Sequence, residues 1–426
     1  MKEASERIED KYFFMKDSLG VGLFGTVYKA RHKENGQIRA VKKIRKDHQK
    51  AKDIESLLKD VEILKKLDHP NIIKVYEFYQ DQSSYYIVTD FCAGGELFDR
   101  IIQEKNFNES RAAEMMKYIL SAIAYCHEKG LVHCDLKPEN ILLASSDPNE
   151  TLMKIIDFGN SSFCKPGERL KSKFGSVYYV APEVLQASYN EKCDVWSLGV
   201  ILFLMLSGKP PFNGNNDQAI LTAVYRGEYS IAGPEWENIS DEAKDLISKM
   251  LIKDFNSRIS AKEALNHSWF TNNTKEKILK LEMPIARRSL RNLKDFRAGT
   301  KLQEAILYFL VNQLTSKEES QDLLDQFLSI DSDGDGKLTH DDLIKAYAKT
   351  GKDPIEAEEI VRTIMKHADK SSSGFINYSE FVTASISKRK FFSEERLQLA
   401  FKLFDKENKG HIGVQELKQI FNSGVF

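Results

Sequence analysis

The strongest constraint on the fold of this 426-residue chain is a repeat in its last quarter. Three short acidic segments begin at Asp331, Asp369 and Asp405, at nearly constant intervals, and each lies between stretches with helical periodicity. A regular internal period indicates a repeated structural unit rather than three unrelated loops. We therefore expect three helix–loop–helix units, which together form an all-α domain in this part of the chain.

The first acidic segment has the spacing of a calcium-binding EF-hand loop. Oxygen donors stand at positions 1, 3, 5, 9 and 12, and a glycine at position 6 allows the sharp turn. Leu338, at position 8, can pair with a neighbouring loop. Position 12 is Asp342, which is shorter than the usual Glu and leaves room for competition by Mg²⁺. The expected ligands are Asp331, Asp333, Asp335, Lys337 and Asp342.

The other two loops are less complete. The second has only two carboxylates but keeps the Glu at position 12, which favours Ca²⁺. The third has Lys409 where an oxygen donor belongs, so we expect damaged binding there. EF-hands normally work in pairs, and the third has no fourth loop after it in this sequence. The candidate ligands are Asp369, Ser371, Ser373, Phe375 and Glu380 in the second loop, and Asp405, Glu407, Lys409, His411 and Glu416 in the third.

The composition is that of a globular protein without a strong overall charge. Hydrophobic residues make up 42% of the chain, and the formal net charge is −1, which gives no general attraction to nucleic acid. The five cysteines are scattered and odd in number, which favours a reducing, cytoplasmic setting over a disulfide framework. No run of ~18 uncharged apolar residues occurs and the first residues lack the apolar core of a signal peptide, so we expect no transmembrane segment.

The region before the repeat changes character along its length. Short β-branched and aromatic runs surround one helical stretch from about Lys11 to Val88, and helical periodicity dominates from about Glu96 to Phe270. A basic, amphipathic stretch then runs from Ile285 to Leu314. The expected units are an extension at 1–11, a first domain at 12–270, a junction at 271–314 and the repeat domain at 315–426.

A glycine-rich segment opens the first domain. Residues 20–25 fit the pattern G-x-G-x-x-G, which on its own is also found in Rossmann dinucleotide-binding turns. A Rossmann turn opens a helix, whereas the residues from Thr26 to Arg31 alternate like a strand. No Gly-Lys-Ser/Thr follows, so the segment is not a Walker P-loop either.

Four further motifs follow the glycine-rich segment in a fixed order. Together they resemble those of eukaryotic protein kinases, and the resemblance covers roughly residues 12–270. It implies an α+β, bilobal protein kinase fold with a β-rich N-lobe and a helical C-lobe, followed here by the EF-hand domain. The motifs are Ala40-Val41-Lys42, the segment from His133 to Asn140, Asp157-Phe158-Gly159 and Ala181-Pro182-Glu183. The resemblance also implies that Arg258 is the partner of Glu183.

The resemblance also implies a role for each motif in phosphoryl transfer, which depends mainly on positioning and charge neutralisation. Lys42 would hold the α- and β-phosphates of ATP, and Asp157 and Asn140 would hold Mg²⁺. Asp135 would orient the substrate hydroxyl and accept its proton, with Lys137 neutralising the transferred group, as in the serine/threonine branch. The residues expected around ATP are Leu19, Gly20, Val21, Gly22, Leu23, Phe24, Gly25, Thr26, Val27, Ala40, Lys42, Thr89, Asp90, Cys92, Glu96, Glu139, Asn140, Leu142, Ile156 and Asp157.

Several of these positions bear on specificity. Thr89 corresponds to the gatekeeper, and Asp90 and Cys92 would offer hinge backbone to adenine. Glu96 and Glu139 would favour protein substrates with basic residues shortly before the phosphorylated Ser or Thr. The alternative is that both glutamates only cap helices.

Two positions depart from the family pattern. Asp60 stands where the N-lobe helix normally carries Glu, and Glu62 lies about 200° further around that helix and cannot replace it. The shorter Asp60 needs a closer helix or a water to pair with Lys42, unless the change has no consequence. Cys134 replaces the usual Arg, so a phosphate on the activation loop has lost one counter-charge and we expect the switch to lie elsewhere. A thiol nucleophile at Cys134 is the alternative, against which the surrounding kinase motif argues.

The stretch from Ile285 to Leu314 is typical of a calmodulin target, because it is a basic amphipathic helix. A kinase domain followed by such a junction and EF-hands resembles the calcium-dependent protein kinases of plants and protists. The resemblance implies ATP, Mg²⁺ and Ca²⁺ as cofactors. It also implies that the junction, with Arg287 and Arg288 as substrate mimics, inhibits the kinase until calcium-loaded hands bind the junction helix.

Three classes of function stay open at this point. The first is a calcium-activated serine/threonine kinase, and the second is a calcium-binding pseudokinase scaffold, for which Asp60 is the only support. The third is a kinase that needs separate calmodulin, which fused EF-hands would make redundant. The junction helix itself has a plainer alternative, in which it only packs on the kinase lobe.

Overall fold

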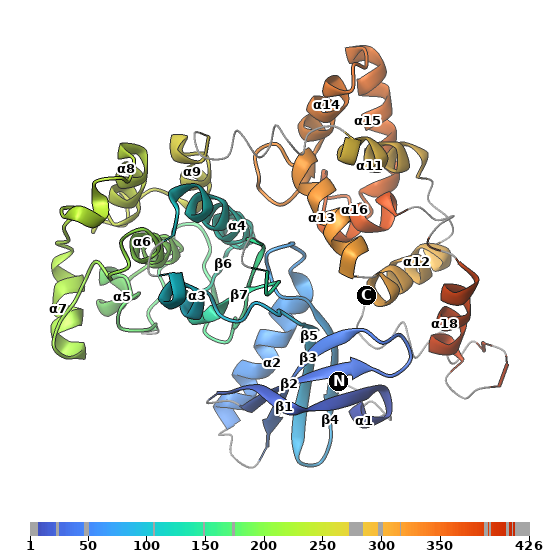
Figure 1. Cartoon of the computed structure of the whole chain (residues 1–426), viewed down its shortest axis with the longest axis horizontal. Helices are drawn as coiled ribbons and strands as arrows, with labels where there is room; N and C mark the ends of the chain where they lie inside the picture. The colour runs from blue at the N-terminus through green and yellow to red at the C-terminus, as the bar shows by residue number, and fades with distance from the viewer. Residues whose placement is uncertain are drawn as a thin grey trace.

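The computed structural model of the chain has a small β-rich lobe and a larger helical lobe, followed by a helical C-terminal domain (Figure 1). This arrangement confirms the predicted fold class. The structure describes residues 7–22, 25–46, 51–104, 107–147, 150–172, 175–271, 284–296, 301–315, 317–386, 391, 393–405, 409–410 and 412–413.

The N-lobe is built on one antiparallel sheet with strand order β1-β2-β3-β5-β4, and helix α2 packs beside it. Side chains alternate between the two faces of the sheet, and the buried ones on β3, β4 and β5 include Val41, Tyr79 and Val88. Gly25 is needed where β2 begins, because a Cβ there would lie 2.1 Å from the Lys43 carbonyl oxygen. The elements are α1 (Ile8–Lys11), β1 (Tyr12–Gly22), β2 (Gly25–His32), β3 (Ile38–Arg45), α2 (Ala51–Lys66), β4 (Val75–Gln80) and β5 (Ser84–Asp90).

The C-lobe surrounds two buried helices, α4 and α6, whose apolar residues form the centre of the largest hydrophobic cluster. Helix α6 is apolar on every side, as expected of a helix in the core. The elements are α3 (Leu97–Glu104), α4 (Glu109–Glu128), β6 (Leu131–Val132), η1 (Pro138–Asn140), β7 (Ile141–Leu143), β8 (Met153–Ile155), β9 (Ser162–Phe163), α5 (Pro182–Leu185), α6 (Lys192–Ser207), α7 (Asp217–Arg226), η2 (Pro234–Trp236), α8 (Asp241–Met250) and α9 (Ala261–Leu265).

The C-terminal domain contains the first two EF-hands and the junction. Its loops pair through a short sheet in which Leu338 lies opposite Ile376, so the pairing predicted for Leu338 is confirmed. The amphipathic stretch from Ile285 to Leu314 forms two helices, α11 and α12, on either side of residues that the structure does not describe. The elements are α11 (Pro284–Asp295), α12 (Lys301–Leu314), α13 (Lys317–Ile330), β10 (Leu338–Thr339), α14 (His340–Lys349), α15 (Pro354–Ala368), β11 (Phe375–Ile376), α16 (Tyr378–Ser385) and α18 (Glu394–Phe404).

Helix α11 lies against the helices of the first two hands. It contacts α13, α15 and α16, and its buried residues Leu290 and Leu293 belong to the same apolar cluster as Phe327 and Phe381. The Tyr347 hydroxyl donates a 2.6 Å hydrogen bond to the Leu290 carbonyl. The junction helix is therefore seated in the apolar groove of the EF-hand pair.

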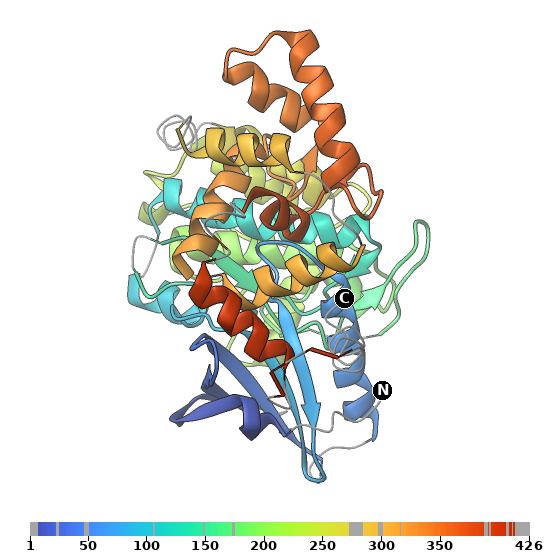
Figure 2. The same cartoon turned by 90° about the vertical axis from the view of Figure 1, so that its right-hand side faces the viewer.

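The C-terminal domain rests on both kinase lobes (Figures 1 and 2). On the N-lobe, the Asn35 amide donates to the Gln313 carbonyl at 2.8 Å, and the Lys74 ammonium donates to Asn312 at 2.6 Å. On the C-lobe, Lys337 of the first calcium loop forms an ion pair with Glu128 at the end of α4. The sensor thus spans the two lobes in this arrangement.

Among the described residues, none of the helices is both long enough and apolar enough to cross a membrane.

A buried ion pair joins Arg258 to Glu183 of α5 in the C-lobe. The Arg258 guanidinium, which has no exposed surface, donates to Glu183 with an Nη2–Oε2 distance of 2.9 Å. Its Nε also donates to the Ile252 carbonyl. The pairing predicted from the kinase motif is confirmed.

We predict that Arg258→Met destabilises the kinase domain by about 3–5 kcal/mol, because Glu183 is then left buried without its partner. The midpoint of kinase unfolding in denaturant measures this. The double variant Arg258→Met/Glu183→Leu should recover part of the loss. Equal stability of the single variant and the unmodified protein would contradict the prediction.

Candidate active site and calcium-binding loops

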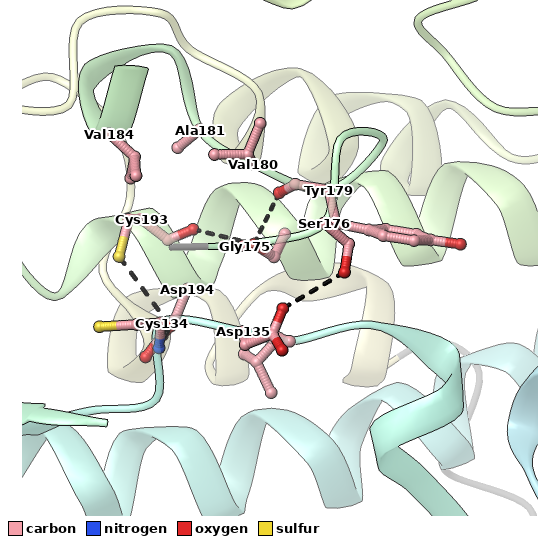
Figure 3. A pocket seen from close by; sticks show the side chains of 12 residues that line it. Cys134, Asp135, Gly175, Ser176, Tyr179, Val180, Ala181, Val184, Cys193 and Asp194 are labelled. Carbon is pink, nitrogen blue, oxygen red and sulfur yellow. Dashed lines mark hydrogen bonds between the residues drawn. The ribbon is translucent and has the colours of Figure 1, made fainter. Parts of the chain in front are cut away.

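Four polar side chains, two from the catalytic loop and two from the segment that follows Asp157, contact Asp135. The Lys137 ammonium lies 3.6 Å from one carboxylate oxygen of Asp135, and the Asn160 amide donates to the same oxygen at 3.4 Å. The Ser176 hydroxyl donates to the other oxygen at 3.3 Å (Figure 3). The Asn140 amide nitrogen donates to the Asp135 carbonyl at 2.8 Å. These contacts orient the carboxylate that is expected to receive the substrate hydroxyl.

The backbone of this loop is hydrogen-bonded to the carboxylate of Asp194 in α6. One Asp194 oxygen accepts the His133 N–H at 2.8 Å and the other accepts the Cys134 N–H at 2.9 Å. Cys134 itself has a φ of 68°, in the left-handed region. The loop is therefore set by a buried anion on the core helix rather than by its own sequence alone.

Cys134 lines a small pocket between the catalytic loop and the activation segment, beside Cys193 and Ser176 (Figure 3). None of the described residues that line this pocket is cationic. The arrangement agrees with the expectation that a phosphate on the activation segment would lack a counter-charge here. Cys193 is buried, and burial raises the pKa of its thiol well above the usual range.

Asp60 reaches the segment that begins at Asp157. It is 6% exposed, and one of its carboxylate oxygens accepts the Phe158 N–H at 3.0 Å. Burial raises the pKa of Asp60 to about 6, and the nearby Asp157 adds to this, while the charge of Lys42 and the Phe158 N–H oppose it. Glu62 points to solvent, as its helical position predicts. The shorter Asp60 is thus accommodated by direct contact with the backbone after Asp157.

The residues expected around ATP come from both lobes. Strands β1 and β2 carry Leu19 to Gly22 and Gly25 to Val27, β3 carries Ala40 and Lys42, and Thr89 and Asp90 end β5. The C-lobe supplies Glu139, Asn140, Leu142, Ile156 and Asp157, while Leu23 and Phe24 lie outside the described residues.

Asp90 has a structural role that its hinge position did not reveal. Its half-buried carboxylate accepts hydrogen bonds from the Tyr76 hydroxyl at 2.7 Å and from the Lys74 N–H at 3.1 Å, and it pairs with Lys154 at 3.1 Å. Its own N–H donates to the Lys74 carbonyl at 3.3 Å. The hinge is therefore joined to the start of β4, next to the contact with the C-terminal domain.

Asp157 and Asn140 fit a magnesium ion by their chemistry. Both offer hard oxygen ligands, the type that Mg²⁺ prefers. The Asn140 amide nitrogen is already bonded to Asp135, which leaves its oxygen as the available donor. Asp157 has a φ of 63°, a left-handed conformation that is uncommon outside glycine and is often found at functional sites.

Glu96 and Glu139 form an acidic patch beside the catalytic loop. Burial raises the pKa of Glu96, and the negative charges of Asp99 and Glu139 raise it further. One carboxylate oxygen of Glu139 is buried and has no hydrogen-bond partner among the described residues. Such an acceptor is suited to a cationic group of a bound peptide.

The first calcium loop gathers three carboxylates in a small volume. Oxygens of Asp331, Asp333 and Asp335 lie within 4.8 Å of one another. Burial and the neighbouring charge of Asp335 raise the pKa of Asp331 well above its usual range, and burial with the charge of Asp333 raises that of Asp335 to about 6. Asp342 accepts the Thr339 N–H at 2.9 Å and the Ser332 N–H at 3.1 Å. A divalent cation would relieve this repulsion, so the residues fit Ca²⁺.

The second loop is closed by hydrogen bonds to its first and last ligands. Asp369 accepts the Ser373 N–H at 3.0 Å, and its hydroxyl neighbour Ser371 lies 3.3 Å away. Glu380 accepts the Lys370 N–H at 2.9 Å, and burial raises its pKa. Phe375 stands in β11 and offers its carbonyl, which already accepts the Ser373 hydroxyl at 2.9 Å.

The third loop is described only in part. Asp405 accepts the N–H groups of Lys409 at 2.8 Å and Gly410 at 2.6 Å, as the first residue of an EF-hand loop does. Glu407, His411 and Glu416 lie outside the described residues. Damaged calcium binding in this loop stays a prediction.

Three residues that join the sensor to the kinase were missed in the sequence. Ser379 donates its hydroxyl to Asp68 at 2.8 Å, and the Lys74 ammonium reaches Ser379 at 3.2 Å. Asn160, which contacts Asp135, was also missed, although it directly follows Gly159. Only the position of Ser379 inside the second loop offered a signal.

Comparison with known proteins agrees with this geometry. Residues 13–270 match the protein kinase domain, residues 320–386 match an EF-hand domain pair, and residues 396–425 match a single EF-hand domain. Calcium-dependent protein kinase 4 of Plasmodium falciparum is 45% identical over 95% of this chain and 78% of its own length. Calcium-dependent protein kinase 4 of Plasmodium berghei is 44% identical over 95% of this chain and 79% of its own length. Calcium-dependent protein kinase 3 of Plasmodium berghei is 39% identical over 98% of this chain and 74% of its own length. Because such relatives span nearly the whole sequence, this chain belongs to the calcium-dependent protein kinase family.

Proposed function

We propose that this chain is a cytoplasmic serine/threonine kinase that Ca²⁺ activates. It transfers the γ-phosphoryl group of ATP to hydroxyl groups of proteins that carry basic residues nearby. The observation that carries the proposal is the orientation of Asp135 by Lys137, Ser176 and Asn160, together with a calcium-sensor domain that touches both kinase lobes.

The catalytic step follows from the placement of these groups. Asp135 orients the substrate hydroxyl and accepts its proton as the oxygen attacks the γ-phosphorus in line with the leaving ADP oxygen. Lys137, beside Asp135, neutralises charge on the transferred group. Lys42 positions the α- and β-phosphates. Mg²⁺, when held by Asp157 and Asn140, neutralises the phosphate charge that remains.

The regulatory step depends on the junction. With the hands engaged, α11 is seated among α13, α15 and α16, and its apolar residues are covered. Without calcium, we propose that the EF-hand groove closes and releases α11, so that the junction inhibits the substrate side of the kinase. Arg287 and Arg288 would then act as substrate mimics, although their side chains lie outside the described part of the structure.

The two other classes of function are less well supported. A pseudokinase scaffold is opposed by the oriented Asp135 and by Asn140 and Asp157, whose chemistry fits Mg²⁺. A requirement for separate calmodulin is opposed by α11, whose apolar face already packs on the EF-hands of the same chain.

One assay tests the proposal directly. Phosphate transfer from ATP to a basic Ser-containing peptide is measured with Ca²⁺ or with chelator, each with and without calmodulin, and Asp135→Asn serves as the inactive control. We expect transfer that requires Ca²⁺ and does not respond to calmodulin. Transfer that is absent in all conditions, or that needs calmodulin, would contradict the proposal.

Asp60 gives a sharper prediction about the catalytic half. Asp60→Asn removes the negative charge next to Lys42 and weakens the bond from the Phe158 N–H. A hydrogen bond to a charged group is worth about 1.5–3 kcal/mol, so kcat should fall about tenfold to hundredfold. Steady-state kinetics at saturating Ca²⁺ measure this. Glu62→Gln, two residues away and exposed, is the control and should leave kcat unchanged.

Asp60→Glu keeps the charge and should retain more activity than Asp60→Asn. If the Asn variant kept full activity and the same calcium requirement, the departure at this position would have no catalytic consequence.

The acidic patch predicts the substrate preference. Glu139→Gln should lower kcat/KM for a peptide with Arg before the Ser by about tenfold, because a charge-assisted hydrogen bond becomes a neutral one. The same peptide with Ala in place of Arg should change much less. An unchanged ratio between the two peptides would remove Glu139 from substrate recognition.

A further inference from the structure

The two calcium loops contact neighbouring residues of the kinase domain, the second loop at Asp68 and the first loop at His69. In the second loop, the Ser379 hydroxyl donates to one Asp68 oxygen at 2.8 Å, and the Ser379 N–H donates to the other at 3.1 Å. In the first loop, Gly336 lies so close to His69 that a Cβ on Gly336 would be 2.0 Å from the His69 Nε2. Two loops that pair with each other therefore rest on one dipeptide.

The same dipeptide is also hydrogen-bonded to the C-lobe. The Tyr125 hydroxyl of α4 accepts the Asp68 N–H at 2.9 Å, and the Ser121 hydroxyl lies 3.1 Å from the His69 Nε2. The dipeptide is thus enclosed between the core helix of the C-lobe and the calcium sensor. Its position depends on both.

Asp68 lies two residues after the end of helix α2, which ends at Lys66 and carries Asp60. The helical stretch from Asp60 to Lys66 spans about 9 Å, and a helix transmits a displacement of its end along that length. Asp60 in turn bonds the Phe158 N–H, next to the Mg²⁺ candidate Asp157. A restraint on Asp68 is therefore a restraint on the catalytic end of α2.

On the sensor side, the contact lies in the first turn of α16. Ser379 is position 11 of the second loop and precedes Glu380, the expected bidentate calcium ligand at position 12. In this turn Glu380 also accepts the Asn377 N–H at 3.0 Å. A ligand and a docking residue that are adjacent in one helical turn cannot move independently.

We propose that Asp68 is a positioning residue through which calcium in the second loop places helix α2 and its Asp60. The first turn of α16, ordered around Ca²⁺ by Glu380, presents the Ser379 hydroxyl and N–H to the Asp68 carboxylate. This inference rests on the proposed activation by calcium and names the contact that carries it. Because coupling is reciprocal, the same contact strengthens calcium binding by the second loop.

The test is a double-mutant cycle in the full-length chain with Asp68→Ala, Ser379→Ala and the double variant. The matched control is Asp341→Ala, since Asp341 holds position 11 of the first loop and its side chain is 87% exposed. Two quantities are measured: calcium affinity by calorimetry, and the calcium concentration for half-maximal phosphate transfer.

We expect Asp68→Ala to lower the calcium affinity about tenfold and to raise the calcium concentration for half-maximal transfer by a similar factor. The reason is that it removes two hydrogen bonds to a charged group. Ser379→Ala should have a smaller effect, since the backbone N–H still reaches Asp68. The double variant should bind calcium almost as well as Asp68→Ala does. Any further loss should come only from the missing bond between Lys74 and Ser379. Asp341→Ala should match the unmodified chain.

Two results would overturn the inference. The first is that both single variants have the same calcium affinity, and the same calcium concentration for half-maximal transfer, as Asp341→Ala. The second is strict additivity of the two single effects. If Asp68→Ala impairs folding, the calcium affinity of Ser379→Ala serves as the test instead, because this variant removes only one oxygen atom. If the unmodified chain itself showed no activation by calcium, the proposed function would fail instead, and the calorimetric cycle would still report on the contact.

Discussion

The hydrogen bond from the Phe158 N–H to Asp60 joins the helix α2 to the segment that begins with Asp157. Whether Asp60 reaches this segment depends on where the helix lies. Asp60 is one methylene shorter than the Glu that the family pattern provides, so α2 has less freedom in its position. Because α2 must lie close to the segment that begins with Asp157, a contact from another domain can control its placement.

The calcium-sensor domain makes contact where such control is possible. It reaches the end of α2 through Asp68, the start of β4 through Lys74 and the C-lobe through Glu128. Lys74 is joined by its N–H to Asp90 in the hinge, so one side of the hinge and one end of the catalytic helix share the same support. The junction helix α11 completes the sensor by packing on the helices of the first two hands.

Much of this could be predicted from the sequence, because the relevant signals are local. The kinase motifs are short strings whose order is fixed by the fold, and the calcium loops follow from a spacing of oxygen donors. The pairing of Arg258 with Glu183 and of Leu338 with the neighbouring loop followed from the same patterns, and the structure contains both.

Contacts between distant segments could not be predicted in this way. Periodicity predicted helix from Ile285 to Leu314 but not its division into α11 and α12, each of which packs on a different set of neighbours. Ser379 and Asp68 are ordinary polar residues in their local sequences, and only the docking of the two domains brings them together. Asp90 was assigned to the hinge for its backbone, whereas the bonds of its carboxylate to Tyr76 and Lys154 depend on the tertiary fold.

In the proposed coupling, calcium in the sensor orders helix α2. Amide hydrogen exchange of the unmodified full-length chain, followed as Ca²⁺ is raised, tests it most directly. We predict that amides of residues 58–69 become protected over the same range of calcium concentration as those of the second loop. Protection of the loop with no change in residues 58–69 would contradict the account.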